Sequence, residues 1–426
     1  MIHSLKEFLK NSFTAYHACD NVKALLTENG FTQLSETDDW ELAEGGKYFI
    51  ERNGSALIAF CIGGLDDFSY RIVASHLDSP ALKLKENSAE KADAYTALNV
   101  EKYGGGIWYS FFDRPLKIAG RAVFEDNGKL RAQTVTSDFC VSIPSVAIHL
   151  NRSVNDGFSV NIQTDMRPLA ALGNDCTENE LLCAVTDGAC PISYDLFLAN
   201  AQEPYFFGVN NEFLASPRID NLTNVYASLQ ALLAHAPCQG VCVTAMLDNE
   251  EIGSASLQGA GGDFLENVLK RIAYALRFDD NEYYKALASS FLLSADNAHA
   301  RHPNHPEKSD TSNKTVLGGG VVLKSHAEKA YTTDATSAAI IKTIFDRAGV
   351  KRQTFFNRSD MRSGGTLGAI TLSHVGVLSA DVGLAQLAMH SACECFAIAD
   401  WTEMVNGMTA FYSSNILING AEICIE

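Results

Sequence analysis

Downstream of residue 215 the sequence alternates between helical and strand patterns, and this alternation restricts the fold more than any other feature. One helical stripe of apolar residues consists of Leu222, Val225, Leu229, Leu232 and Leu233. The apolar run GVCVTAML then has the length of a buried strand, and a helical pattern at 264–276 precedes the strand-like run FLLSAD. Helices that alternate with buried strands indicate an α/β sheet.

The same pattern is present near the amino terminus. We expect short helices at about 5–13 and 21–29, followed by the strand-like runs GGKYFIERN, SALIAFCIGG and YRIVASH. The region before residue 85 therefore begins the α/β domain that resumes after residue 215.

Between these two parts the sequence changes to short β-like runs separated by turns. The runs GIWYSFF, IAGRAVFEDNGKLRA and FSVNIQT are typical, and Asp126-Asn127-Gly128 is a hairpin signal. A chain of 426 residues exceeds what one core usually supports. We therefore expect residues 1–85 and 216–426 to form one α/β domain, with residues 86–215 inserted in it as a β-rich domain.

The charge and the termini exclude several classes of protein. The net charge of -18 argues against partners that are bound through phosphates or anionic lipid headgroups. The start, MIHSLKEFLKNSF, lacks the apolar centre of a signal peptide, and no apolar run approaches the length of a membrane span. The eleven cysteines show no C-x-x-C zinc pairing and are interpreted as packing thiols of a reducing compartment. We expect a cytoplasmic protein with neither nucleic acid nor membrane partners.

Residues of the kinds that bind metals follow several of the expected strands. His76 follows YRIVAS, Glu250 and Glu251 follow GVCVTAMLDN, and Asp296 follows FLLSA. The carboxyl ends of strands meet at the ligand-binding edge of an open α/β sheet. Singly, each residue is better interpreted as structural or solvated. Together, paired carboxylates after a buried strand carry a repulsion and desolvation cost that a dication would relieve, so metal binding is the better interpretation.

Three further residues also have a structural interpretation that needs no metal. Asp220 precedes a helix and could be its N-cap. Asp78 is close enough to His76 to accept its second ring N–H, as carboxylates do beside metal-bound histidines, but an ordinary turn residue is equally compatible. His390, beside Met389 at an apolar helix start, reads as a packed histidine when considered alone.

Other catalytic signatures are missing from the sequence. GGGVV and SGGTLG lack the Gly-Lys-Ser/Thr ending of a phosphate-binding loop, and neither a GxSxG elbow nor an HExxH helix occurs. Nucleotide-binding, serine hydrolase and single-zinc protease functions are therefore disfavoured.

The assembled segments resemble the aspartyl aminopeptidase family of dinuclear zinc metallopeptidases over nearly the whole chain. The matching segments, in chain order, are SHLDSPALKLK, YGGGIWYSFFDRPLKIAGRAV, VAIHLNR, SPRIDNLTNVYASLQAL, DNEEIGSAS, SADNAHARHPNHPEK, GGGVVLK, SDMRSGGTLG and DVGLAQLAMHS. The chain departs from the family near its start, where NSFTAYHACD replaces a proline-containing run. The resemblance implies a mixed-sheet, zinc exopeptidase-like α/β domain with an inserted β-rich dimerisation domain.

The resemblance also implies roles for individual residues. His76, Asp220 and Asp296 would bind one metal, most often zinc but also cobalt or manganese, and Asp220 would bridge to a second metal. Glu251 and His390 would complete the second site. Glu250 would be the general base toward a water that bridges the metals.

Three expectations extend beyond the metals. His149 of VAIHLNR would reach a neighbouring subunit's active site and steady the oxyanion there. Spacing alone would instead make His149 a half-buried strand histidine. Lys324 of GGGVVLK is the candidate partner for the side-chain carboxylate of an acidic amino-terminal residue. The family also implies dimers that assemble into a tetrahedral dodecamer.

Two alternatives remain open. A dinuclear aminopeptidase of broad or neutral specificity would share the metals and differ only in the substrate pocket. A catalytically silent, shell-forming scaffold would keep the fold without the activity.

Overall fold

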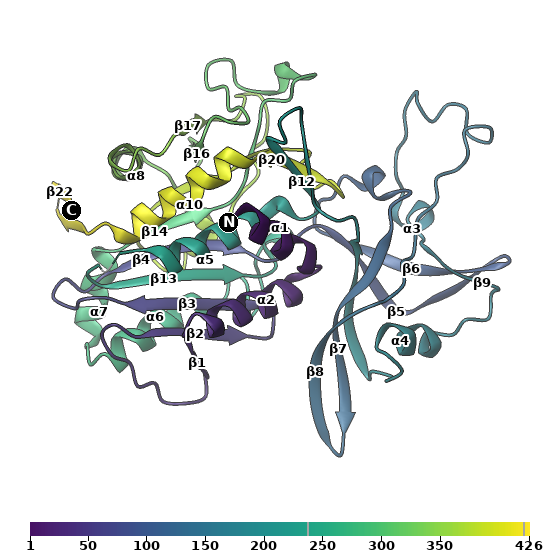
Figure 1. Cartoon of the computed structure of the whole chain (residues 1–426), viewed down its shortest axis with the longest axis horizontal. Helices are drawn as coiled ribbons and strands as arrows, with labels where there is room; N and C mark the ends of the chain where they lie inside the picture. Colours follow the sequence, from purple (N-terminus) through teal and green to yellow (C-terminus); the bar gives the residue numbers. More distant parts are fainter. Residues whose placement is uncertain (237, 421) are drawn as a thin grey trace.

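A nine-stranded mixed sheet forms the centre of the larger part of the molecule (Figure 1). This computed structural model describes residues 1–236, 238–420 and 422–426. The strand order is β1-β2-β3-β13-β4-β14-β18-β16-β17. The strands are β1 (Thr32–Leu34), β2 (Lys47–Arg52), β3 (Ala56–Ile62), β4 (Tyr70–His76), β13 (Val241–Leu247), β14 (Phe291–Ala295), β16 (Val321–Lys324), β17 (Arg352–Phe355) and β18 (Leu378–Gly383).

The middle of this sheet is parallel. β13, β4, β14 and β18 run in one direction, so their carboxyl ends share one edge. Every residue of β4, β13 and β14 is buried, as expected for strands that are covered on both faces. The predicted α/β sheet with buried strands is confirmed.

Helices cover both faces of the nine-stranded sheet and bury two separate cores. One face is packed by α1, α2, α5, α8 and α10, and the other by α6, α7 and α9. These helices are α1 (Ile2–Asn11), α2 (Ala15–Glu28), α5 (Ile219–Ala234), α6 (Phe264–Ala275), α7 (Asp280–Ala288), α8 (Ala335–Arg347), α9 (Leu367–Thr371) and α10 (Ile398–Ser413). The second predicted amino-terminal helix starts well before residue 21, because Tyr16, Ala18 and Cys19 already pack into the core.

A six-stranded antiparallel sheet forms the second lobe, on the right of Figure 1. Its order is β8-β7-β10-β5-β6-β9, and its own apolar core includes Leu82, Leu98 and Ile118. The elements of this lobe are β5 (Ala81–Ala92), β6 (Tyr95–Tyr103), η1 (Trp108–Phe111), β7 (Leu116–Asp126), β8 (Lys129–Thr136), α3 (Ile162–Asp165), β9 (Leu169–Leu172), α4 (Glu178–Val185) and β10 (Ser193–Asn200). The β-rich character predicted for the middle of the chain is confirmed.

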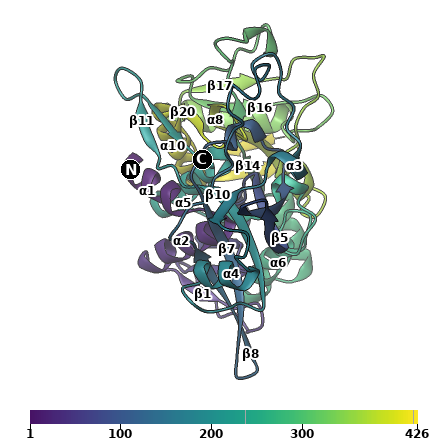
Figure 2. The same cartoon turned by 90° about the vertical axis from the view of Figure 1, so that its right-hand side faces the viewer.

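Local predictions in this lobe had mixed outcomes. The hairpin at Asn127-Gly128 is confirmed, since Asp126 pairs with Lys129 and both loop residues have positive φ. GIWYSFF is not a strand but the 3-10 turn η1, which buries Phe111, and FSVNIQT contains the short helix α3. Figure 2 shows the β7–β8 hairpin extending beyond the rest of the lobe.

Helix α2 joins the two lobes through polar contacts. His17 Nε2 lies 2.6 Å from Thr136 Oγ1, and Thr134 donates a hydrogen bond to Asp20 at 2.6 Å. The hydroxyl of Tyr16 donates to Asp195 of β10 at 3.3 Å. The second lobe is therefore held against the first beside the edge where the parallel strands end.

The remaining strands form two small sheets. The five-stranded sheet has the order β11-β12-β20-β19-β15 and places the segment around His390 beside the start of α5. Its strands are β11 (Tyr205–Phe207), β12 (Phe213–Ser216), β15 (Ala298–His299), β19 (Ala385–Leu387) and β20 (Glu394–Ala397). The two-stranded sheet pairs β21 (Ile416–Asn419) with β22 (Glu422–Ile425). Two further 3-10 turns are η2 (Glu250–Ile252) and η3 (Pro306–Lys308).

Candidate metal centre

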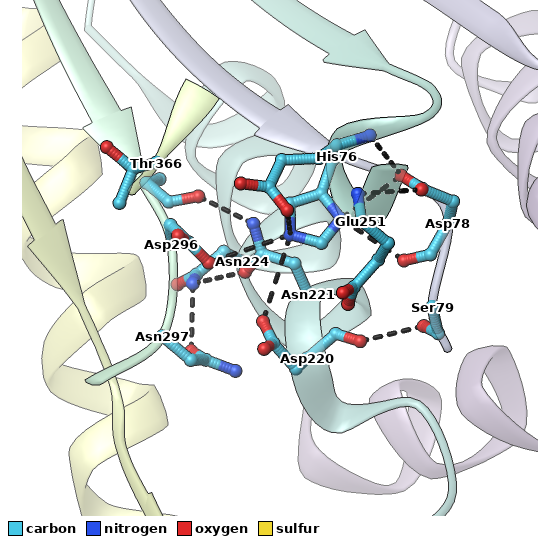
Figure 3. Close-up of polar contacts among 12 residues, drawn as sticks. His76, Asp78, Ser79, Asp220, Asn221, Asn224, Glu251, Asp296, Asn297 and Thr366 are labelled. Carbon is cyan, nitrogen blue, oxygen red and sulfur yellow. Dashed lines mark hydrogen bonds and ion pairs between the residues drawn. The ribbon is translucent and has the colours of Figure 1, made fainter. Parts of the chain in front are cut away.

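The carboxyl edge of the parallel strands gathers the predicted metal ligands into one cluster. His76 ends β4, Asp296 follows β14, and Glu250 and Glu251 lie in η2 after β13. Asp220 comes from the first turn of α5, where Asp220 and Asn221 have non-helical backbone angles and are joined by a cis peptide bond. Figure 3 shows the side chains of His76, Asp220, Glu251 and Asp296 converging from these elements.

Distances divide the cluster into two groups that share Asp220. On one side, His76 Nε2 lies 3.6 Å from Asp296 Oδ1 and 3.8 Å from Asp220 Oδ1. On the other side, His390 Nε2 lies 3.3 Å from Asp220 Oδ2 and 3.4 Å from Glu251 Oε1. Each group brings one imidazole and two carboxylates within reach of a single ion.

Both histidines direct their Nε2 atoms toward the carboxylates of the cluster. His76 Nδ1 lies 3.1 Å from the carbonyl oxygen of Asp78, and His390 Nδ1 lies 3.0 Å from the carbonyl oxygen of Gly105. An N–H at each Nδ1 leaves the lone pair of each Nε2 directed toward the carboxylates, which is the tautomer that a metal ligand needs.

Two carboxylate oxygens in the cluster lack a partner. Asp220 Oδ1 and Glu251 Oε1 are buried, and neither accepts a hydrogen bond from any residue that the structure describes. A buried anionic oxygen without a donor is costly, and a bound cation removes that cost. The residues present therefore fit divalent metal ions.

The protonation of the cluster shows the same excess of negative charge. Burial alone would lower the pKa of His76, but contacts with Asp296 and Asp78 raise that pKa well above its usual range. Burial raises the pKa of Glu250 to about 7, and repulsion from Asp296 acts in the same direction. Asp296 behaves differently, because the Lys324 ammonium at 3.6 Å and His76 hold its pKa well below the usual range against the effect of burial.

Asp78 connects His76 to the turn that carries the glutamates. Its Oδ1 lies 3.3 Å from His76 Nδ1 and accepts the backbone N–H of Glu250 at 3.1 Å. Its Oδ2 accepts the N–H of Glu251 at 3.2 Å and the hydroxyl of Tyr103 at 2.7 Å. Asp78 therefore fixes both the imidazole and the position of the two glutamates.

The sequence did not reveal Glu394. This buried residue accepts the backbone N–H of Asp220 at 3.0 Å and that of His390 at 2.7 Å, so it fixes two neighbouring side chains at once. Burial raises its pKa to about 8. The only sequence signal is an acid four residues after His390 in a mostly apolar stretch.

The local structure predicted from the sequence for two histidines was wrong. His390 lies in a turn between β19 and β20, with a positive φ, and not at a helix start. His149 is exposed in the irregular segment between β8 and α3, and not half-buried in a strand. His149 is also outside the cluster of its own chain.

Lys324 is buried at the edge of the cluster. It ends β16, and its side chain donates a hydrogen bond to the carbonyl oxygen of Asn297 at 3.1 Å. The ammonium also pairs with Asp296, so Lys324 adds one positive charge beside the carboxylates.

Comparison with known proteins identifies the family of the chain. Residues 8–412 match the family model described as aminopeptidase I zinc metalloprotease, M18. The chain belongs to the M18 peptidase family. A probable M18 family aminopeptidase 2 of Clostridium acetobutylicum is 39% identical over 422 residues, with 96% of this chain and 98% of that protein covered.

Solved structures of M18 aminopeptidases have the same fold. Ape4, in a complex with Nbr1, has a TM-score of 0.92 at 34% identity over 96% of this chain and 85% of that one. The mApe1 dodecamer of S. cerevesiae has a TM-score of 0.82 at 27% identity over 96% of this chain and 95% of that one. The M18 chain described here is a metallo-aminopeptidase of a zinc-dependent family.

Two further features concern the helices and the cysteines. Across the described residues, no helix combines the length and apolarity that a bilayer crossing requires. Cys183 and Cys190 form a disulfide, so the interpretation of all cysteines as packing thiols was wrong for this pair.

Proposed function

We propose that the cluster holds two divalent metal ions, most simply zinc. His76, Asp220 and Asp296 would bind one ion, and Asp220, Glu251 and His390 the other. The observation that carries this proposal is that the two oxygens of Asp220 face different histidines, 3.8 Å and 3.3 Å away. Ions bound there would polarise the scissile carbonyl and acidify a water molecule.

Glu250 is proposed as the general base. Its Oε2 lies 4.0 Å from His76 Nε2, and its side chain is 17% exposed, compared with 3% for Glu251. Glu250 is thus the glutamate with room to take a proton from water and to return it to the leaving amine. Asp78 supports both glutamates through their backbone N–H groups and positions them for these separate tasks.

The activity is tested by one paired assay. Purified protein is analysed for bound metal, and the same sample is given a short unblocked peptide and a matched peptide with an acetylated amino terminus. We expect stoichiometric divalent metal and release of a free amino acid from the unblocked peptide only. Bound metal without release would instead support the silent scaffold.

The preferred amino-terminal residue is proposed to be acidic, with Lys324 as the partner of its carboxylate. Support comes from the position of the ammonium beside Asp296, next to the proposed metals. A second candidate, neutral or broad specificity, is favoured by the burial of Lys324, which is 1% exposed and already bonded to Asn297. Values of kcat/KM for Asp, Glu, Leu and Met amino-terminal substrates separate the two, and no advantage for Asp or Glu would reject the acidic pocket.

We also propose that the β-rich lobe completes the active site of a neighbouring subunit through His149. Support comes from the exposure of His149 and of nearby Val146, Ile148 and Leu150. Dimers made in this way would assemble further into a tetrahedral dodecamer, and mApe1, a relative, forms a dodecamer. Light scattering of the purified protein tests the assembly.

We keep 1–85, 86–215 and 216–426 as proposed domain limits because the six-stranded sheet has its own core. The strands of that sheet run from Ala81 to Asn200, whereas β12 pairs with β20, so the structure favours a slightly earlier start and end for the insert. We propose the cytoplasm as the compartment because nine of the eleven cysteines are free thiols, with Cys183 and Cys190 as the one bonded pair. Limited proteolysis tests the limits, and cell fractionation tests the compartment.

A further inference from the structure

A second polar cluster lies at the opposite end of the strands that carry the metal centre. Strand β4 ends in His76 and has Arg71 near its start, where Arg71 pairs in register with Cys242 of β13. Cys238 lies just before β13, and its sulfur is 3.3 Å from that of Cys242. His235, at the end of α5, completes the cluster.

Arg71 is a buried cation without a carboxylate partner. It is 1% exposed, and its Nη2 donates a hydrogen bond to Cys238 Sγ at 3.2 Å. Among the described residues, neither its Nε nor its Nη1 has a hydrogen-bond acceptor, so no carboxylate accepts from either atom. A guanidinium stays charged in proteins, and a buried charge requires a counter-charge. In the part of the chain that the structure describes, the groups beside this guanidinium that can supply an anion are the sulfurs of Cys238 and Cys242, and Cys242 already donates to the carbonyl oxygen of Tyr412, which leaves Cys238 as the anion.

The other groups around Cys238 support an anionic sulfur. The pKa of Cys238 lies well below that of an ordinary thiol. The largest cause is its hydrogen bond with Cys242, and hydrogen bonding with His235 and the charge of Arg71 lower the pKa further. Cys61 of β3, which pairs in register with Cys242 of β13, behaves in the opposite way, because burial raises the pKa of its thiol to about 12. Cys238 is also partly exposed, whereas Cys242 and Cys61 are buried.

We propose that Cys238 is a reactive thiolate paired with Arg71, and that a peroxide converts it, together with Cys242, into an intrachain disulfide. The thiolate nucleophile and a second thiol beside it are the two parts that such an oxidation needs. A soft metal ion is the competing occupant of His235, Cys238 and Cys242, but the fixed charge of Arg71 repels a cation there.

The proposed reaction balances with hydrogen peroxide as the oxidant. The Cys238 sulfur attacks one peroxide oxygen, the O–O bond breaks, and the departing hydroxide takes a proton to become water. The Cys242 sulfur then gives up its proton and displaces the oxygen of the Cys238 sulfenic acid as a second water. The two sulfurs are oxidised, the peroxide is reduced, and one S–S bond has formed.

The thiolate is tested by alkylation of the native, metal-loaded protein at about pH 6, where few ordinary thiols react. Peptide mapping compares Cys238 with exposed Cys140 and with buried Cys61 in the same sample. We expect Cys238 to react at least ~10-fold faster than either. Arg71→Met should remove this advantage and Arg71→Lys should retain part of it, so the charge is tested even if the first variant folds poorly.

The disulfide is tested by adding a stoichiometric amount of hydrogen peroxide and mapping the peptides without reduction. We expect a Cys238–Cys242 bridge in the native sequence, none in Cys238→Ser, and a sulfenic acid that a 1,3-diketone traps in Cys242→Ser. Alkylation of Cys238 no faster than Cys140, or alkylation that begins only after a chelator removes a bound metal, would overturn the proposal. Both readouts are independent of peptidase activity.

Discussion

The candidate metal centre and the β-rich lobe differ in how far contacts within one chain bury their side chains. At the centre, His76 and Asp220 are almost fully buried, and neighbouring groups of the same chain hold them in place. In the lobe, the segment between β8 and α3 leaves Leu150 83% exposed and Phe158 45% exposed. A single chain therefore builds its own candidate ligand set, whereas the segment between β8 and α3 leaves large apolar side chains at the surface.

This contrast has a physical cause. Strand ends in a packed sheet are rigid, so ligands placed there keep their geometry without help from a partner. A segment with few helices or strands has little packing of its own, so it opens locally at a lower free energy than a packed strand. The comparison predicts that substitutions at the centre act within one subunit and that substitutions in the segment act between subunits.

Asp220→Ala should have the largest effect, because both groups of ligands lose the residue that they share. We expect loss of both metal ions and no measurable turnover, checked by elemental analysis and by amino acid release. Asp346→Ala is the matched control, since Asp346 pairs with Arg352 on the surface. Retention of both metals in the Asp220 variant would contradict the shared role.

Glu250→Gln should reduce turnover by about 100-fold to 10,000-fold while metal binding persists. The amide keeps the size of the side chain but cannot accept the proton. Turnover and metal content are measured on the same preparation. Near-normal turnover would exclude Glu250 as the base.

His149→Ala should reduce turnover by about 100-fold to 1,000-fold, the range for loss of one oxyanion donor. The sharper experiment mixes this variant with Glu250→Gln under conditions that let subunits exchange. A mixed assembly pairs an intact Glu250 in one chain with an intact His149 from the other, so activity should return. If mixing the two variants restores no activity, His149 does not act across an interface.

Glu394→Gln should have the smallest effect, about 10-fold to 100-fold in metal affinity or turnover. Glu394 does not face the cluster as a ligand but accepts the backbone N–H groups of Asp220 and His390. Titration of the metal-free variant with zinc measures the affinity, and Glu403→Gln on α10 is an acid control outside the centre. An unchanged affinity would limit Glu394 to a role in folding.

The sequence predicted those parts of the molecule that depend on local patterns. Buried strands were recognisable from apolar runs, and their carboxyl ends located His76, Glu250 and Asp296, because parallel strands bring their ends to one edge. The Asn127-Gly128 turn was predictable for a similar reason, since its two residues tolerate positive φ.

Features that depend on tertiary contacts were not predictable from local patterns. Glu394 has a role only because β20 lies against β12, which brings it to the start of α5. The run GIWYSFF has strand-forming residues but becomes a turn, since Phe111 packs into the core of the second lobe. Similarly, the environment of Arg71 depends on the register between β4 and β13, which neither strand specifies alone.

The order of the ligands along the chain has a consequence for biosynthesis. His76 leaves the ribosome long before His390 and its support Glu394. A growing chain that has not yet reached Glu394 therefore lacks part of the proposed ligand set, however well its first strands have folded. We expect such a chain to hold at most one of the two proposed metal ions.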